Sequence, residues 1–255
     1  MRKELFYNPA LLIERIAEEI SDRRRIGRLK GTIASGLSKD QISSLEFIDM
    51  AAKTNAIKTA YDLGANVGTW TLLAKTLIPE ITVHAFEPIP LYQQGYLDST
   101  AKLDRVTLHK VGAGSDNRHE KFNFSGHSSS FLDVSENLLK MFPNEKKVGE
   151  ITVEMVKLDD YVTKNNLPLP DLMKLDVEGY ELEVLKNALN CMKHCRYIIL
   201  EVSFIERHIG QPLFDEVVYF MGQHHYRVHA FPYRMHLTQP IHMADVLFKN
   251  TLYND

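Results

Sequence analysis

Residues 61–70, YDLGANVGTW, place two glycines, an asparagine and an aspartate between two apolar segments. Gly64 and Gly68 can adopt positive φ angles, and neither has a Cβ atom that would keep a ligand away from the backbone. The helix expected directly after this loop presents free N–H groups and a positive dipole end, which suit an anionic group. The stretch therefore predicts a ligand-binding loop, with a plain strand-to-helix turn as the competing interpretation.

Three classes of ligand compete for this loop. A nucleoside triphosphate loop would end in lysine followed by serine or threonine, and this stretch has no such pair. A dinucleotide loop would read G-x-G-x-x-G, but Asn66 stands where the second glycine would be. The third class is S-adenosylmethionine, whose small carboxylate needs less glycine than a pyrophosphate. Asp62 is placed to help hold its ammonium group, so this class fits the residues best.

Acidic residues follow several of the predicted strands. Glu87 ends the second strand, where an acid in dinucleotide folds accepts the ribose hydroxyls. Asp62, Asp176 and Glu201 also stand at or near the carboxyl ends of predicted strands. In an open α/β sheet these ends meet at one edge, where ligands bind. Four acids at one edge are hard to explain by core packing, so we expect a functional site there.

The elements that position these residues follow from the apolar pattern. Short apolar segments alternate with helical patterns, which indicates parallel strands joined by crossover helices. The predicted strands are 58–63, 81–87, 105–112 and 197–202, together with a strand that opens the segment 171–179 and leads into a helix. Two later segments, 226–231 and 242–248, are predicted to form an antiparallel pair at the sheet edge. Residues 120–124 and 151–158 alternate in polarity and are predicted to pair as a hairpin.

The N-terminal residues show a different pattern. Apolar residues share one helical face within residues 9–23, and a second amphipathic helix is predicted within 36–52. We therefore divide the chain into an N-terminal helical extension or cap, residues 1–56, and a Rossmann-like domain, residues 57–255. The extension either caps the site or pairs with a second copy of the chain, and the sequence does not separate these roles.

Composition limits the function classes. The chain has 255 residues, 44% of them hydrophobic, and a formal net charge of −3, which offers no field to attract nucleic acid. Cys191 and Cys195 are too few for a disulfide framework and are interpreted as reduced thiols. No apolar run approaches the ~18 residues of a membrane helix, and charges interrupt the N-terminal apolar residues, unlike in a signal peptide. We therefore expect a cytoplasmic protein without a membrane span or a nucleic-acid partner.

Four segments together resemble the FkbM-type methyltransferases, namely AYDLGANVGTWTLLAK, VHAFEPIP, VKLDDYV and MKLDVEGYELEVLKNA. The resemblance implies the class I methyltransferase fold, a Rossmann-like α/β fold with a seven-stranded, mostly parallel sheet and an antiparallel last strand. It also implies S-adenosylmethionine-dependent O-methylation of a hydroxyl on a sugar, glycan or secondary metabolite. The N-terminal and C-terminal segments outside the resemblance are expected to shape the acceptor site.

The resemblance also assigns site residues. The cofactor-binding residues that match the family's motifs are Asp62, Gly64, Asn66, Gly68, Glu87, Gly112 and Asp176. Glu87 corresponds to the acid at the ribose, and Gly112 lies where class I enzymes place backbone around the adenine. Asp176 is expected at the junction of cofactor and acceptor.

Methylation of an alcohol requires a group that takes the hydroxyl proton. The candidates for this catalytic base are Asp176 at the sheet edge and two histidines, His127 and His208, since a histidine near neutral pKa suits the task. Alternatively, Asp176, Glu178 and Glu201 could hold a divalent ion such as Mg²⁺ that lowers the pKa of the acceptor. We do not favour this alternative and assign no metal ligands.

Other functions compete with this interpretation. An NAD-dependent oxidoreductase is disfavoured by the spacing of the glycine loop. A nucleic-acid methyltransferase is disfavoured by the near-neutral charge and by the sequence DVEG after the fourth strand. A non-catalytic S-adenosylmethionine-binding protein and an N-methyltransferase acting on a small molecule stay open. The expected partner is a small-molecule or glycan acceptor, with a homodimer left open.

Overall fold

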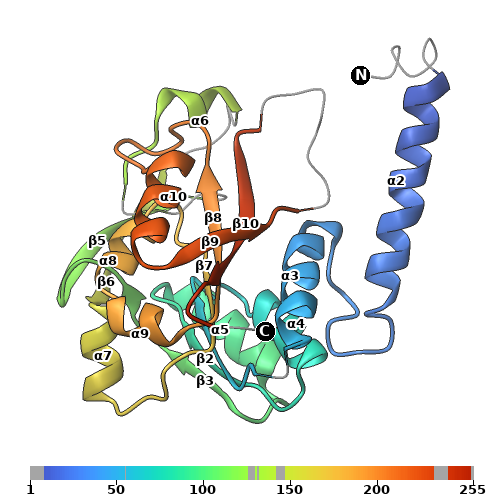
Figure 1. Ribbon diagram of the computed structural model, residues 1–255. Coiled ribbons are helices and arrows are strands. Elements are labelled where there is room, and N and C mark those ends of the chain that lie inside the picture. Colours follow the sequence, from blue (N-terminus) through green and yellow to red (C-terminus); the bar gives the residue numbers. More distant parts are fainter. Residues whose placement is uncertain are drawn as a thin grey trace.

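The computed structural model describes residues 9–54, 56–125, 130, 132–141, 147–232 and 241–253. Its centre is a seven-stranded sheet in the order β3-β2-β1-β7-β8-β10-β9 (Figure 1). The strands are β1 (Thr59–Leu63), β2 (Thr82–Phe86), β3 (Val106–His109), β7 (Leu172–Leu175), β8 (Tyr197–Ser203), β9 (Tyr226–Ala230) and β10 (Met243–Asn250). Every apolar segment that was predicted as a strand of the main sheet is present in it.

The pairing confirms the predicted α/β sheet with an antiparallel last strand. β1 lies between β2 and β7, while β2 pairs with β3 and β7 with β8, all in parallel. β10 runs antiparallel to both of its neighbours, β8 and β9. All of β1 is buried, as expected for a parallel strand that is covered on both faces. The strand order reverses between β1 and β7, and such a switch point is where open α/β sheets bind ligands.

Helices cover both faces of the sheet. α3 (Ile42–Ala52) and α4 (Thr69–Leu77) pack on the face of Ala60, and α5 (Pro90–Thr100) packs there through Tyr96. The next residue of β1, Tyr61, points to the opposite face, because successive side chains of a strand alternate. That face is covered by α7 (Leu158–Lys164), α8 (Glu181–Lys186), α9 (Leu189–His194) and α10 (Phe214–Gln223).

A second, three-stranded sheet has the order β4-β6-β5. β5 (Arg118–Ser125) and β6 (Lys147–Val156) pair antiparallel, which confirms the predicted strand pair. The chain between them is not a tight turn and includes α6 (Glu136–Met141). β4 (Gly112–Ala113) pairs in parallel with β6, so the backbone of β4 is fixed beside the end of the main sheet.

The N-terminal residues form two unlike parts. α2 (Pro9–Gly27) projects from the body of the molecule (Figure 1), and four apolar residues on it are exposed, Leu12, Ile13, Ile16 and Ile20. After a short 3-10 helix, η1 (Lys39–Gln41), α3 buries Phe47 and Ile48 in a core that it shares with β8 and β10. The division of the chain at residue 56 stays a prediction.

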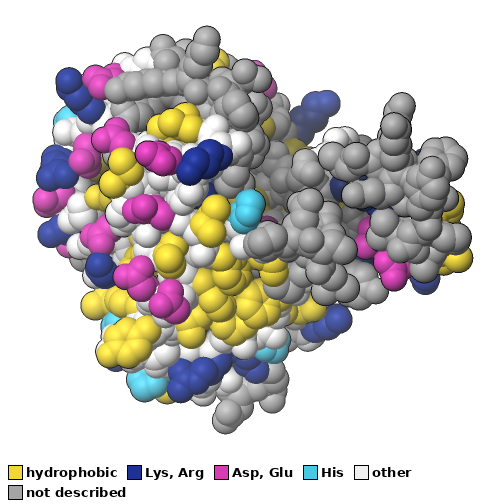
Figure 2. Space-filling model, turned by 90° about the horizontal axis from the view of Figure 1, so that it is seen from above, with side chains coloured by type: hydrophobic (Ala, Val, Ile, Leu, Met, Phe, Trp, Pro, Cys, Tyr) yellow, Lys and Arg dark blue, Asp and Glu magenta, His cyan; other side chains and the backbone are white. Residues whose placement is uncertain are grey.

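The surface carries mixed charge. Seen from above, described acidic and basic side chains are interspersed around hydrophobic ones, without a continuous basic area among them (Figure 2). This distribution agrees with the net charge of −3 and offers a polyanion little to bind on this face. Among the helices of the described residues, none is long and apolar enough to cross a membrane.

Candidate active site

A cavity of about 700 Å³ lies at the carboxyl ends of β1, β2, β7 and β8. Residues of η1, α3 and the start of β10 complete its wall. Because parallel strands end at the same edge of a sheet, the residues that follow β1, β2 and β7 meet in this cavity although they are far apart in sequence.

The glycine loop forms one wall of the cavity, and both of its glycines have positive φ angles. Gly64 has φ +81°, and a Cβ atom at this position would lie 1.9 Å from the backbone oxygen of Asp176. Gly68 has φ +87° and is the N-cap residue of α4. Only glycine adopts such a conformation without strain. Of the two, Gly64 lines the cavity and Gly68 does not.

Asp62 lies beneath the loop and not in the cavity wall. Its side chain is fully buried, and its Oδ2 atom accepts a 2.7 Å hydrogen bond from the hydroxyl of Thr71 in α4. Its Oδ1 atom has no hydrogen-bond partner among the described residues. Burial raises the pKa of Asp62. In this position Asp62 links β1, which precedes the loop, to α4, which follows it.

Glu87 lines the cavity directly after β2 and is only 3% exposed. Its Oε2 atom accepts a hydrogen bond from the backbone N–H of Asn66, and its Oε1 atom accepts one from the N–H of Ile89, both at 2.8 Å. Burial raises the pKa of Glu87 to about 7, against the opposing effect of these two hydrogen bonds. Each oxygen keeps a lone pair for a ligand hydroxyl.

Gly112 lines the same side of the cavity as Glu87. A Cβ atom at this position would lie 2.5 Å from the sulfur atom of Met155 and 3.3 Å from Pro88. The absence of a side chain therefore lets β4 pack closely between Met155 of β6 and Pro88, which follows β2. This close packing brings backbone, and not a side chain, to the cavity wall.

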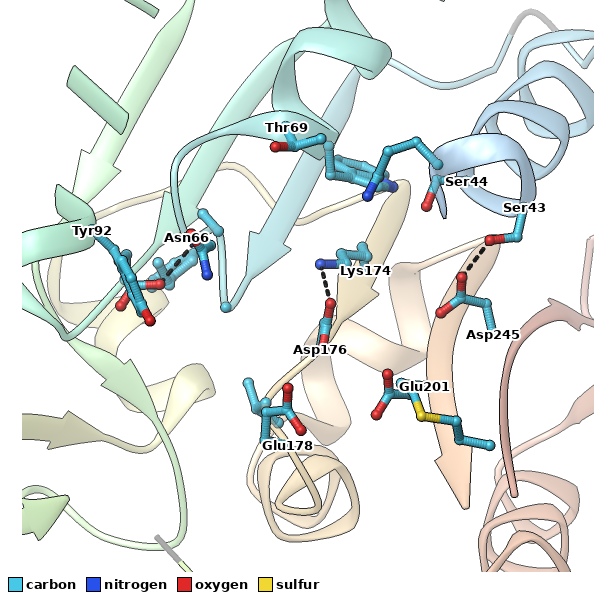
Figure 3. A pocket seen from close by; sticks show the side chains of 18 of the residues that line it. Ser43, Ser44, Asn66, Thr69, Tyr92, Lys174, Asp176, Glu178, Glu201 and Asp245 are labelled. Atoms are coloured by element: carbon cyan, nitrogen blue, oxygen red, sulfur yellow. Dashed lines mark hydrogen bonds and ion pairs between the residues drawn. The ribbon is translucent and has the colours of Figure 1, made fainter. Parts of the chain in front are cut away.

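An ion pair occupies the middle of the cavity. The ammonium group of Lys174, in β7, lies 3.0 Å from the Oδ2 atom of Asp176 (Figure 3). Burial by itself would lower the pKa of Lys174, but the carboxylates of Asp176 and Asp62 raise it above the ordinary value. The lysine therefore stays charged. Sequence reasoning did not assign Lys174 to the site, although a lysine that interrupts an apolar strand two residues before an acid is a detectable signal.

Two glutamates beside this ion pair share one arginine. Arg207 donates to Glu201 at 2.8 Å and lies 3.3 Å from Glu178. Burial, together with the charge of Asp176, raises the pKa of Glu178 to about 8 and that of Glu201 well above its ordinary value. Glu178 also has φ +53°, which is uncommon for a residue with a side chain. One guanidinium thus holds both carboxyl groups in place.

The far side of the cavity is built by residues that sequence reasoning missed. Ser43, in α3, donates a hydrogen bond to Asp245, at the start of β10 (Figure 3). Burial raises the pKa of Asp245, against the opposing effect of this hydrogen bond. An acid inside the apolar segment HMADVLF was the one available signal, and nothing in the sequence marked Ser43.

The predicted site residues are only partly brought together. Gly64, Asn66, Glu87, Gly112 and Asp176 line the cavity, whereas Asp62 and Gly68 support it from behind. The structure does not bring His208 to the cavity wall, because its side chain is fully buried and its backbone bridges to Val134. His127 lies outside the described residues. Within those residues, no three His, Cys, Asp or Glu side chains are grouped to hold a metal ion.

Curated relatives match the central part of the chain. A hexuronic acid methyltransferase, AglP, of Haloferax volcanii is 31% identical over 146 residues, which cover 56% of this chain and 54% of the relative. A 2-O-methyltransferase, NoeI, of Sinorhizobium fredii is 27% identical over 158 residues, which cover 59% and 65%. The chain thus spans about half the length of the first curated relatives that it matches, 54% and 56%.

Solved structures match more of the chain at lower sequence identity. A putative O-methyltransferase from Klebsiella pneumoniae has a TM-score of 0.49 and 13% identity, and the match covers 89% of this chain and 85% of that one.

The model of the methyltransferase FkbM domain matches residues 62–228. This range contains the glycine loop, Glu87 and the segment around Asp176, and it leaves out α2, α3 and β10. Since the match covers more than half of the chain, the protein belongs to the methyltransferase FkbM domain family.

Proposed function

We propose that this chain is an S-adenosylmethionine-dependent methyltransferase that methylates a hydroxyl group of a small-molecule or glycan acceptor. The observation that carries the proposal is the joint placement of Gly64 and Glu87 in one cavity at the switch point of the sheet. At Gly64 a ligand can approach the backbone, and at Glu87 a buried carboxylate can accept ribose hydroxyls. Family membership and the names of both curated relatives support methyl transfer.

The residues present fit S-adenosylmethionine. The N–H groups at the start of α4, where Thr69 and Trp70 line the cavity, suit its carboxylate. Glu87 would accept the ribose hydroxyls, and the side-chain-free backbone at Gly112 would border the adenine. Asp62 would act on the ligand through the loop that it holds. When bound, the cofactor supplies an electrophilic methyl carbon.

Asp176 is our candidate for the catalytic base. Its side chain is 37% exposed and faces the cavity, where it can take the proton of an acceptor hydroxyl. Lys174 donates a hydrogen bond to one oxygen of Asp176, which orients the carboxylate and leaves the other oxygen for the acceptor. We do not assign the base to His208, because a fully buried ring outside the cavity wall cannot reach the acceptor.

The cellular compartment, the division into domains and the kind of acceptor are also proposals. Both cysteines, Cys191 and Cys195, are free and buried, which suits a reducing compartment such as the cytoplasm. We propose residues 57–255 as the methyltransferase domain and residues 1–56 as an extension that completes the acceptor side. The relatives' names point to hydroxyl groups of sugars as the kind of acceptor.

Isothermal titration calorimetry with S-adenosylmethionine and S-adenosylhomocysteine tests the proposal. The wild-type protein is expected to bind both ligands, and Glu87→Ala is expected to lose at least about tenfold in affinity, because the ribose hydroxyls lose their acceptor. Glu154→Ala serves as a control, since Glu154 is an exposed carboxylate of β6 outside the cavity wall. A folded wild-type protein that binds neither ligand would contradict the proposal.

A further inference from the structure

The cavity has two halves, with the Lys174–Asp176 ion pair between them. Asn66 and Tyr92 lie on one side of this pair, and Ser43 and Asp245 lie on the other (Figure 3). The first half contains the loop and Glu87, and is the half assigned above to the cofactor. The second half, called here the acceptor half, is formed by Ser43, Trp70, Glu201 and Asp245. It includes α3 and β10, which lie outside the family match.

We propose that the acceptor half selects a polyhydroxylated acceptor that is neutral or carries an amine near the methylated hydroxyl, and that it rejects acidic acceptors such as uronic acids. This inference rests on the proposed methyltransferase function. It names the class of acceptor and the residues that select it.

The charges around the acceptor half carry the first part of the argument. Four carboxyl groups meet two cationic groups there, the carboxyl groups being those of Asp176, Glu178, Glu201 and Asp245, and the cationic groups those of Lys174 and Arg207. Both cations already hold carboxylates of this set. Neither cation is therefore left to pair with an incoming acid, which would have to bury its charge beside Asp176 and Asp245 without a partner, and this disfavours its binding.

The charged residues nearer the opening do not change this balance. Lys39 of the cavity wall forms an ion pair with Glu19, and Glu46 of the wall forms one with Arg25 at 2.9 Å. Among the described residues of the wall, every lysine is thus engaged by a carboxylate of the protein itself. An acidic acceptor would find no uncommitted lysine within that described part of the wall.

Trp70 provides an independent sign that a ligand belongs in this half. Its side chain is 2% exposed and lines the cavity, and its indole Nε1 atom has no hydrogen-bond partner among the described residues. A buried donor without a partner costs free energy unless a ligand satisfies it. Once the indole ring turns toward the cavity, a hydroxyl oxygen would accept from this N–H, while hydroxyl or ammonium hydrogens of the same molecule donate to Glu201 and Asp245. A polyol or amino sugar meets both demands at once.

The proposal separates this chain from one of its relatives. The relative from Haloferax volcanii is named for hexuronic acid, an acidic sugar. The acceptor half of this chain is built in part by α3 and β10, outside the region of shared family sequence. Two members of the family can therefore share the cofactor half and differ in the charge of the acceptor that they admit.

Ligand-observed NMR titrations with three methyl glycosides test the inference. The probes are methyl glucoside, methyl glucosaminide and methyl glucuronide, which differ in charge at closely similar size. The wild-type protein is expected to bind the first two at least about tenfold more tightly than the glucuronide. In the variant Glu201→Gln/Asp245→Asn, this preference is expected to shrink to less than about threefold, because two carboxyl groups are replaced by amides of the same shape, which cannot ionise and which can donate to an acidic acceptor.

The controls make each outcome decisive. Asp245→Asn alone keeps an oxygen that accepts from Ser43. This single variant should reduce in part the preference against the glucuronide, and it serves as the test if the double variant does not fold. Glu154→Gln should leave the preference unchanged. Equal or tighter binding of the glucuronide to wild-type protein, an unchanged preference in the folded variants, or binding of none of the three probes would overturn the inference. Titration of S-adenosylhomocysteine into the same samples reports separately on the proposed function.

Discussion

At the scale of single residues, the site depends on carboxyl groups whose surroundings give them different tasks. Glu87 is buried and holds two backbone N–H groups, so it is a fixed acceptor. Asp176 is partly exposed and held by Lys174 on one side, so it can exchange a proton with a ligand. Two carboxyl groups at one sheet edge therefore suit binding and proton transfer respectively.

The affinity for S-adenosylmethionine should depend on pH through Glu87. Its pKa is about 7, and ribose hydroxyls donate to the charged form, so affinity should fall as pH drops below about 7. The fall approaches tenfold per pH unit at its steepest. Calorimetry across this range should show a weaker pH dependence in Glu87→Gln. Equal pH profiles for the two proteins would contradict this role, and the comparison cancels titration of the ligand's own amine.

Asp176→Asn should separate binding from chemistry. The amide keeps the shape of the carboxylate and an oxygen that accepts from Lys174, but it cannot take a proton from an alcohol. The rate of S-adenosylhomocysteine formation with a neutral methyl glycoside should fall by roughly 10²–10⁴-fold, while the affinity for S-adenosylmethionine stays near that of wild-type protein. An undiminished rate would move the base to another residue, with His127 the next to test.

At the scale of elements, the loop between β1 and α4 packs directly against the segment after β7. The backbone of Gly64 packs against the backbone oxygen of Asp176, the residue that also faces the cavity. The register of β1 on β7 sets this contact, since the two strands pair in parallel up to Leu63 and Leu175. A substitution in the loop should therefore shift Asp176, our candidate for the catalytic base.

Gly64→Ala should be far more damaging than Gly31→Ala. Both glycines have φ near +80°, but a Cβ atom at position 31 meets nothing within 4 Å, whereas one at position 64 would overlap the Asp176 oxygen. Gly31→Ala should cost about 1 kcal/mol from backbone strain alone. Gly64→Ala should cost several times more and abolish S-adenosylmethionine binding, as measured by thermal unfolding and calorimetry. Similar unfolding temperatures for both variants would contradict this prediction and would show that the backbone around position 64 shifts to accept a Cβ atom at little cost.

At the scale of the whole molecule, a pair of buried histidines connects β2 and β3 to the helix α7. His84 of β2 and His109 of β3 lie 3.0 Å apart, and His109 is 3.2 Å from the hydroxyl of Tyr161 in α7. Burial lowers the pKa of both rings, that of His109 to about 4. The folded protein therefore keeps these rings neutral at a pH where the unfolded chain would charge them.

This difference predicts a loss of stability in mild acid. Below about pH 6.5 the unfolded chain takes up protons that the folded chain does not, so stability should fall as pH drops from about 6.5 to about 4. His109→Gln should show a smaller drop in unfolding temperature over this range than wild-type protein. His119→Gln, at an exposed position of β5, should show the same drop in unfolding temperature as wild-type protein. If His109→Gln and wild-type protein show the same drop, the buried histidines are not the cause of the loss of stability.

The sequence by itself determined the sheet, its antiparallel last strand and the cofactor edge. These features depend on local patterns, because apolar segments set the strands and parallel strands bring their carboxyl ends to one edge. Gly64, Glu87 and Asp176 follow from these patterns, and the family resemblance adds Asn66 and Gly112; all five line the cavity.

Only the tertiary structure decided what surrounds the ion pair in the cavity. The Ser43–Asp245 hydrogen bond joins residues 202 positions apart. Arg207 bridges Glu178, which follows β7, and Glu201, which lies in β8. The burial of His208 away from the cavity was equally invisible in the sequence. Contacts of this kind depend on how distant elements pack, and no local periodicity records that packing, so the acceptor half became visible only in three dimensions.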